Sequence, residues 1–381
     1  MKNPKTYAFY FPNWHADPLN DKWHGKGWTE WECVKHSCPR FEGHNVRTPL
    51  WGYEDESDPK VMAKKIQTAH DYGISGFIFD FYWFKDLGQY RINCLNEGFL
   101  KAENNELLEF SVMWCNHNPI YAHPAPFRNM QMKDRTLADG GANPEFFYEM
   151  TQYCIDNYFC KPNYQRVDGK VYFGIWNITG LIDNFGGLNG TKIMLDDFRR
   201  RTEAAGYELH LACSKFLVPG YPSYEEPNKE LANNIIKTLG IDSIFTYAWP
   251  DPVSKPGEWP KMEYSDFRKP AIEQYYYDVD FLDTARDIVV SPGWDSNGRT
   301  TQSDYYQEEC GYPYWPITVN NTPEEIEKSF MEAKKFIESG KFNGNMLNIV
   351  WNEWTEGMFF EPDNLYGYGY LEAHKKVFGD K

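Results

Sequence analysis

The stretch DPKVMAKKIQTAHDYGISGFIFDFYW, residues 58–83, contains one complete helix-and-strand unit. It opens with Asp58 and Pro59, a pair typical of a helix start, and apolar residues then recur at helical spacing as far as Gly73. From Gly76 to Trp83 nearly every residue is apolar and many are aromatic. Such a run predicts a strand buried on both faces, as in a parallel sheet that is covered by helices.

The same alternation of apolar runs and helical patterns extends along the whole chain. We expect eight strands, over Thr6–Pro12, Gly76–Trp83, Glu109–Cys115, Lys170–Trp176, Glu208–Ser214, Ser243–Trp249, Asp287–Ser291 and Met346–Trp351. We expect the clearest helices over 59–72, 143–158, 190–205, 227–240, 270–286 and 322–340, and weaker ones over 91–103 and 368–378. Eight such repeats predict an α/β fold of the (β/α)8 TIM-barrel type. A doubly wound open sheet is the alternative, but no Gly-rich phosphate loop follows any run.

Four long connections follow predicted strands, at roughly 13–57, 116–142, 250–269 and 292–321. In a barrel these connections lie at the C-terminal face, where active sites are built. They contain aromatic residues and histidines but no low-complexity tract, so they resemble pocket walls more than linkers. We therefore expect a single catalytic domain over residues 1–381.

The composition narrows the class of partner. A net charge of −16 argues against binding to nucleic acid or to an anionic membrane surface, because both need basic patches. Aromatic residues make up 18% of the chain, and rings with polar edges suit the apolar faces and hydroxyl rims of sugars. We therefore expect an oligo- or polysaccharide as partner. The oligomeric state stays open.

Targeting and metal-binding signals are weak. No apolar run is long enough for membrane insertion and no signal peptide opens the chain, so we expect a cytoplasmic protein for the sequence as given. A removed signal would make it periplasmic or secreted. The eight cysteines lack zinc spacing, and those at 94, 115, 154 and 213 are expected to be buried free thiols. We expect no cofactor and no metal.

The segment NIVWNEWTEG, residues 348–357, places two glutamates directly after the last predicted strand. Two carboxyl groups among aromatic residues suit glycosidic-bond chemistry, in which one holds a proton and the other stays charged. Glu353 and Glu356 can share one pocket only if the chain turns after Asn352. The alternative is a structural glutamate paired with an arginine and a second glutamate on the surface.

Other polar and aromatic residues stand at the predicted strand ends or in the long connections, where they would converge on one barrel mouth. We expect the substrate-binding residues to be Tyr10, His15, Glu30, Trp31, Asp80, Tyr82, Asn116, His117, Trp249, Asp295, Arg299, Trp351 and Asn352.

Two weaker patterns point to other chemistry. His15, His117 and His123 are potential metal ligands, but no spacing defines a site, so hydrogen-bonded or solvated histidines are the better interpretation. Asp278 and Asp280 have the DxD spacing of metal-dependent glycosyltransferases, but they lie in a predicted helix, where we expect a solvated face.

At these residues the chain resembles the WbsX-type bacterial proteins. The match is strong at both ends and weaker between about 120 and 285. It rests on the stretches Tyr10–His15, Asn20–Trp31, Phe41–His44, Asp58–Pro59, Tyr72–Phe77, Tyr82–Trp83, Trp351–Gly357, Glu361–Asp363 and Tyr366–Tyr368. That group is often labelled glycosyltransferase, yet it is similar in fold and motif to glycoside hydrolase family 99, whose (β/α)8 enzymes cleave α-mannosidic bonds with retention.

The resemblance implies unequal roles for the two glutamates. Glu356 would be the general acid/base, and Glu353 would be a base on the sugar 2-hydroxyl, giving a 1,2-anhydro sugar. The sequence departs from the WbsX-type pattern at His117, where relatives usually have glutamate, so the sugar or linkage is expected to differ. A glycoside hydrolase of polysaccharide degradation is therefore the first hypothesis.

Three alternatives remain open beside it. The first is a glycosyltransferase of polysaccharide or O-antigen synthesis. The second is a carbohydrate-binding barrel without catalysis. The third keeps the hydrolase but uses a direct carboxylate nucleophile or base, for which Asp80, Glu30 and Asp295 are the candidates.

Overall fold

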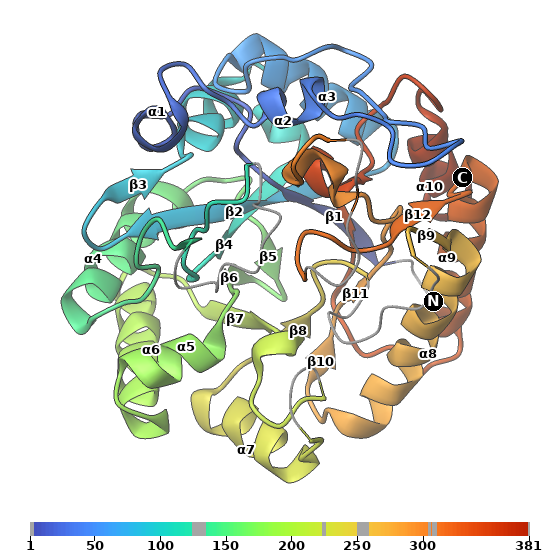
Figure 1. Cartoon of the computed structure of the whole chain (residues 1–381). Coiled ribbons are helices and arrows are strands. Elements are labelled where there is room, and N and C mark those ends of the chain that lie inside the picture. Colours follow the sequence, from blue (N-terminus) through green and yellow to red (C-terminus); the bar gives the residue numbers. More distant parts are fainter. Residues whose placement is uncertain are drawn as a thin grey trace.

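The computed structural model describes residues 4–123, 135–222, 226–249, 259–303, 306 and 311–379. A ring of parallel strands lies at its centre and helices surround the ring (Figure 1), so the predicted (β/α)8 TIM barrel is confirmed. The ring consists of β1 (Lys5–Tyr10), β2 (Gly76–Phe84), β4 (Glu109–Trp114), β6 (Lys170–Ile175), β7 (Leu209–Ser214), β8 (Ser243–Phe245), β10 (Ala285–Arg286) with β11 (Ile288–Val289), and β13 (Met346–Val350).

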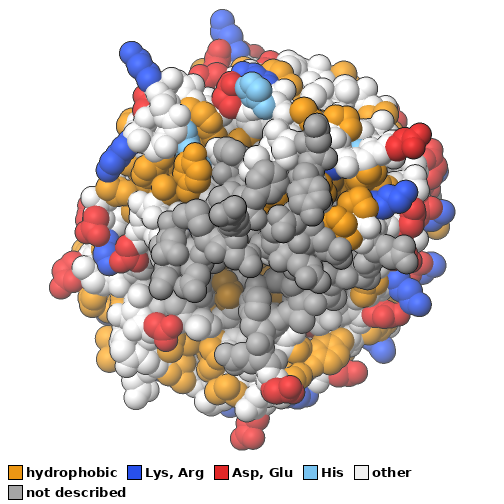
Figure 2. All heavy atoms as spheres, in the orientation of Figure 1, with side chains coloured by type: hydrophobic (Ala, Val, Ile, Leu, Met, Phe, Trp, Pro, Cys, Tyr) orange, Lys and Arg blue, Asp and Glu red, His pale blue; other side chains and the backbone are white. Residues whose placement is uncertain are grey.

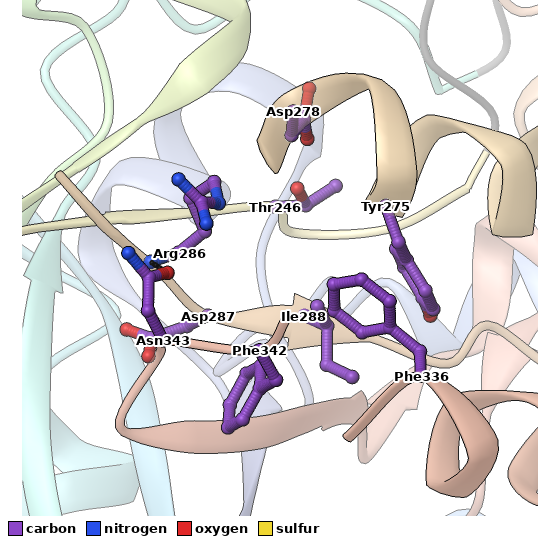
Figure 3. A pocket seen from close by; sticks show the side chains of 9 residues that line it. All are labelled: Thr246, Tyr275, Asp278, Arg286, Asp287, Ile288, Phe336, Phe342 and Asn343. Atoms are coloured by element: carbon purple, nitrogen blue, oxygen red, sulfur yellow. Dashed lines mark hydrogen bonds between the residues drawn. The ribbon is translucent and has the colours of Figure 1, made fainter. Parts of the chain in front are cut away.

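The seventh barrel strand is split, and the two parts close the ring. β10 pairs with β8, whereas β11 pairs with β13. Between them the side chain of Asp287 accepts hydrogen bonds from the backbone N–H groups of Asn345 and Met346, at 2.6 and 3.2 Å. Figure 3 shows Asp287 and Arg286 near Asn343 at this closure, beside a small cavity. A buried carboxyl group thus joins the seventh and eighth strands where the regular pairing changes partner.

The helices form the outer layer of the barrel (Figure 1). They are α3 (Pro59–Asp71), α4 (Pro144–Cys154), α5 (Ile178–Asn184), α6 (Leu188–Ala204), α7 (Lys229–Leu239), α8 (Tyr264–Phe281), α9 (Pro323–Glu338) and α10 (Gly369–Phe378). Asp58, Asn143 and Thr322 cap α3, α4 and α9 by accepting hydrogen bonds from the first turn, as their sequence positions predict. No described helix is long and apolar enough to cross a membrane.

Two predicted helices differ from the observed ones. The helix predicted from Pro270 to Arg286 begins earlier, at Tyr264, and ends at Phe281, with Pro270 in its interior. Tyr264 is fully buried, and its packing outweighs the usual preference of proline for the first turn. The weak helix predicted over 91–103 consists of a π-helical turn, Cys94–Gly98, and a 3-10 turn, Phe99–Lys101.

Most of the smaller elements lie on the C-terminal side of the barrel strands, whereas β5 pairs with the start of β6. Two short helices, α1 (Pro18–His24) and α2 (Trp31–Lys35), lie in the first long connection. The remaining short strands are β3 (Gly88–Tyr90), β5 (Arg166–Val167), β9 (Lys261–Glu263), β12 (Ile317–Val319), β14 (Asn352–Glu353) and β15 (Met358–Phe359). The predicted connections over 116–142, 250–269 and 292–321 lie partly outside the described residues. Figure 2 shows most of the charged side chains near the outline of this face.

Alternation along the strands separates two hydrophobic layers. Phe9, Ile78, Met113 and Phe245 belong to the layer inside the ring, whereas Tyr10 belongs to the layer between strands and helices. Because successive side chains point to opposite faces, only every second residue of a strand has its side chain inside the ring, where it can reach the barrel mouth.

The buried free thiols predicted at 94, 115, 154 and 213 are confirmed.

Candidate active site

A tight turn after β13 brings the two predicted catalytic glutamates to the barrel mouth. β14 and β15 form a small antiparallel pair, and the turn between them spans Trp354–Glu356. Gly357 ends this turn with a φ of +66°, and a Cβ there would lie 2.6 Å from the backbone nitrogen of Asp295. Only glycine fits that close approach. The predicted turn after Asn352 therefore exists, and Glu353 and Glu356 both line a cavity of about 590 Å³.

One guanidinium group holds both glutamates. Arg299 Nη2 lies 2.6 Å from Glu353 Oε1, and Arg299 Nη1 contacts Glu356 Oε1. The hydroxyl of Tyr312 also donates to Glu356 Oε1, at 2.6 Å. Neither glutamate is a surface residue, since Glu353 is 3% exposed and the side chain of Glu356 is 12% exposed. Arg299 thus fixes the relative positions of the two carboxyl groups.

Glu30 supports the same arginine from behind the cavity wall. Its Oε1 lies 3.0 Å from Arg299 Nη2 and 3.1 Å from His123 Nε2, and its Oε2 accepts from Asn13 at 2.6 Å. Burial by itself raises the pKa of the Glu30 carboxyl, but His123 and Arg299 outweigh it and hold this pKa well below its usual range. Glu30 is therefore ionised, and it neutralises part of the charge of Arg299.

Glu353 has the opposite electrostatic character. Burial raises its pKa well above the ordinary value, Arg299 opposes the shift, and Glu356 adds to it. Among the described residues, Arg299 is the only cation paired with all three carboxyl groups, those of Glu30, Glu353 and Glu356. Glu353 is more buried than Glu356 at the cavity wall, so its ionised form is the less favoured of the two. Glu353 is consequently a stronger base than an exposed glutamate.

A third carboxyl group, that of Asp80, lines the same cavity. The hydroxyl of Tyr247 lies 3.0 Å from Asp80 Oδ2 and 3.3 Å from Glu353 Oε2, and so links the two residues. Burial raises the pKa of Asp80 well above its ordinary value, and its other oxygen is buried without a hydrogen-bond partner. Asp80 therefore offers a free polar atom beside the paired glutamates.

The chain matches one protein-family model over almost its full length, from residue 6 to residue 374, and that model describes a glycosyltransferase, WbsX. The chain belongs to the WbsX family. It is also 26% identical, over 97% of its length, to the uncharacterized protein WxcX of Xanthomonas campestris pv. campestris. The match covers 49% of that protein, so the chain spans about half the length of the curated relatives it matches.

Solved structures agree with the fold of this WbsX-family chain. The GH99 endo-α-mannosidase from Bacteroides thetaiotaomicron superimposes with a TM-score of 0.56 at 15% identity, over 99% of this chain and 97% of that one. A glycoside hydrolase-like protein superimposes with a TM-score of 0.60 at 15% identity, over 100% and 95% of the two chains. At this level of identity the likeness supports the TIM-barrel fold alone.

The structure places part of the predicted site at the cavity. Six of the predicted residues line it: Asp80, Tyr82, His117, Arg299, Glu353 and Glu356. Glu30 contacts Arg299 but does not line the cavity. Burial lowers the pKa of His117, which leaves its ring neutral at the mouth.

The other predicted aromatic residues do not line the cavity. Tyr10 and Trp351 belong to the layer between strands and helices, and Trp351 packs on Phe77 with ring centroids 5.2 Å apart. Trp249 packs against Phe267 of α8. Trp31 is buried under the first connection, where its Nε1 donates to a backbone carbonyl. Tyr10 and Trp351 point outward because of their positions in the alternation of their strands. Trp249 follows a strand that ends earlier than predicted, at Phe245, so the alternation does not fix its direction.

The remaining predicted polar residues serve the backbone or stay apart from the cavity. The side chain of Asn116 accepts a hydrogen bond from the backbone N–H of Asn177 and donates one to its carbonyl oxygen, both at 2.7 Å. Asn352 bonds the corresponding groups of Phe11, at 2.8 and 2.9 Å. Asp295 accepts from His44 at 2.9 Å. His15 is 1% exposed, and burial lowers its pKa to about 4.

Several residues of the cavity wall are absent from the predicted substrate-binding set, among them Arg91, Tyr247 and Tyr312. Tyr247 carries a usable signal, because it follows Phe245 by two positions and so shares its inward parity. Arg91 and Tyr312 lie in connections, where no periodicity marks the direction of a side chain. Their positions depend on how the loops fold over the mouth.

The weaker predictions also have outcomes. Within the described ranges, no group of three His, Cys, Asp or Glu side chains is arranged to hold a metal ion. The expectation that Asp278 lies on a solvated face is wrong. Its carboxyl group is buried and accepts from Lys215 Nζ at 2.8 Å and from the hydroxyl of Tyr221 at 2.6 Å.

Proposed function

We propose that the protein is a glycoside hydrolase that cleaves an α-linked glycan. The observation that supports this proposal most is the pair Glu353 and Glu356, held by the two ends of the Arg299 guanidinium on the wall of one cavity. Two carboxyl groups with different environments meet the requirement for one proton donor and one base. The cavity has the size of a site for a small ligand.

In the proposed reaction, Glu356 is the general acid/base and Glu353 is the base on the substrate. Glu353 takes the proton of the sugar 2-hydroxyl, whose oxygen forms a bond to the anomeric carbon. The bond from that carbon to the leaving oxygen breaks while Glu356 donates its proton to that oxygen. Water then opens the 1,2-anhydro sugar at the anomeric carbon, losing a proton to Glu356, and Glu353 returns its proton to the 2-oxygen. Two inversions give net retention.

The environments of the two glutamates support this division of roles. The raised pKa of Glu353 suits a base that must remove a proton from a weakly acidic hydroxyl group. Both described contacts of the Glu356 carboxyl group, from Arg299 and Tyr312, fall on Oε1, which leaves Oε2 to face a leaving oxygen. Asp80 lines the same cavity and is the alternative candidate for a direct nucleophile, whereas Glu30 and Asp295 do not line it.

The test compares two substitutions on a substrate found by screening bacterial and plant glycans. Glu356→Gln is expected to lose about a hundredfold or more in kcat with poor leaving groups, and much less with an activated aryl leaving group. Glu353→Gln is expected to lose activity with both, because the 2-hydroxyl must still be deprotonated. Glu332→Gln on the exposed face of α9 is the control for the change of charge.

Two results would refute parts of the proposal. Unchanged turnover by Glu356→Gln on a poor leaving group would refute its role. A product of inverted configuration, followed by NMR, would refute the retaining route. If the screen gives no hydrolysis, a carbohydrate-binding barrel without catalysis becomes the better account.

The description of the WbsX family favours a second candidate, a glycosyltransferase. Such an enzyme needs a site for a nucleotide sugar. Calorimetry with nucleotide sugars distinguishes the two, since saturable binding at this cavity supports transfer and its absence supports hydrolysis.

A further inference from the structure

Arg91 is a cation of the cavity wall that the proposed reaction does not use. It follows β3 and its side chain is 8% exposed at the cavity that also holds Glu353 and Glu356. Its backbone has a φ of +60°, which is unfavourable for a residue with a Cβ atom. A left-handed non-glycine residue beside a binding cavity is a feature that commonly accompanies function.

Aromatic rings surround the Arg91 guanidinium. Its central carbon lies 4.8 Å from the ring centroid of Phe11, 4.9 Å from that of Tyr82 and 4.4 Å from that of Tyr90. Ring faces stabilise a cation without neutralising it. The three rings therefore hold the guanidinium in place without forming an ion pair with it.

No carboxylate of the described residues forms an ion pair with Arg91, and its Nε has no hydrogen-bond partner. The neighbouring acids are engaged elsewhere. Asp17 accepts from the backbone N–H groups of Leu19 and Arg91, and Asp80 accepts from Tyr247. Glu353 and Glu356 are held by Arg299. Buried charges are normally paired, so an unpaired guanidinium in a cavity calls for an anion from outside the protein.

We propose that Arg91 binds an acidic substituent of the sugar substrate, a carboxylate or an ester of sulfate or phosphate. A guanidinium offers two parallel N–H donors to such oxyanions, a geometry that neutral hydroxyl groups do not match. The substrate class is then an acidic glycan, and Arg91 selects it against its neutral counterpart. This proposal rests on the proposed sugar-cleaving function for the identity of the cavity.

The test measures binding by calorimetry in the Glu356→Gln protein, so that ligands are not consumed. Uronic-acid oligosaccharides are compared with the same oligosaccharides after reduction of their carboxyl groups, and sulfated and phosphorylated oligosaccharides with their unesterified forms. At least one acidic form is expected to bind about tenfold or more tightly than its neutral counterpart, the value of a charge-assisted hydrogen bond. The comparison in which the acidic form binds more tightly identifies the acidic group as a carboxylate, a sulfate ester or a phosphate ester.

Three further substitutions test whether the effect depends on Arg91. Arg91→Met is expected to abolish the preference while Arg200→Met, at a side chain 70% exposed on α6, leaves it intact. His117→Glu keeps Arg91 but adds a carboxylate to the same cavity, since His117 packs against the ring of Tyr82. It is expected to weaken binding of the acidic form more than binding of the neutral form, and it serves if Arg91→Met does not fold.

The outcomes separate this proposal from the hydrolase proposal. Equal binding of acidic and neutral forms in every arm overturns the role of Arg91, even if a neutral glycan is cleaved. A preference that survives in folded Arg91→Met protein, or in His117→Glu, overturns it as well. A preference for acidic glycans that depends on Arg91, together with no cleavage of any glycan by the unsubstituted protein, overturns the hydrolase proposal. The proposal for Arg91 then still holds.

Discussion

Replacement of Asp287 by asparagine is expected to stabilise the barrel at neutral pH. Burial raises the pKa of this carboxyl from an ordinary value near 3.8 to about 6. The folded state therefore holds the proton more tightly than the unfolded state, and stability falls as pH rises between these two values. At about 1.4 kcal/mol for each pH unit, the ionised side chain costs about 3 kcal/mol above pH 6 relative to a neutral isostere.

Asparagine reproduces the contacts of the neutral form. Its side-chain oxygen can accept the backbone N–H groups of Asn345 and Met346, as Asp287 Oδ1 does. The Asp287→Asn protein is thus expected to match the original near pH 3.5. Above pH 6 its free energy of unfolding is expected to exceed that of the original protein by about 3 kcal/mol.

The assay is urea denaturation of both proteins at several values between pH 3.5 and 8. Asp283→Asn is the matched control, since the Asp283 side chain is 76% exposed on the turn before β10 and its replacement is expected to give a small, flat difference. A difference for Asp287→Asn that does not change with pH, or a loss of stability at pH 7, would refute the reasoning.

Three further predictions concern the site and its support. The kcat/KM of the original protein is expected to rise with pH through the elevated pKa of Glu353, because only the ionised form is a base; a plateau that extends unchanged below pH 4.5 contradicts this. Tyr247→Phe removes the hydroxyl between Asp80 and Glu353, and kcat/KM is expected to fall about tenfold to a hundredfold with little change in Tm. Lys65→Met leaves the two buried carboxylates that contact Lys65 without a cation. In denaturation curves it is expected to cost about 3–5 kcal/mol at pH 7 and less at pH 5, because burial raises the pKa of Glu56 to about 7 and this carboxyl group is protonated at pH 5.

Much of the fold could be read from the sequence because a barrel strand is a short, local pattern. Each of the eight apolar runs corresponds to an observed strand, and helix starts such as Asp58 and Thr322 carry their own capping signals. The errors fall where packing over a longer range decides. Pro270 lies inside α8 because Tyr264 and Phe267 bury the turn before it.

The candidate site was predictable only in part, for a related reason. The sequence placed both glutamates after the last strand, but they could share one pocket only if the chain turned after Asn352, and the structure has this turn, ending at Gly357. The choice among aromatic residues depended on strand parity and on where each strand ends. Tyr247 faces the cavity and Trp249 does not, although both follow β8.

The sequence by itself determined the eight-strand barrel and the two glutamates after its last strand, because both depend on contacts between near neighbours in the chain. Only the tertiary structure decided what surrounds those glutamates. Arg299 and Tyr312 come from the connection after β11 and Arg91 from the connection after β2, and they meet because closure of the ring brings the connections after the strands to one face. The charge balance of the cavity, including the unpaired Arg91, exists only after that convergence.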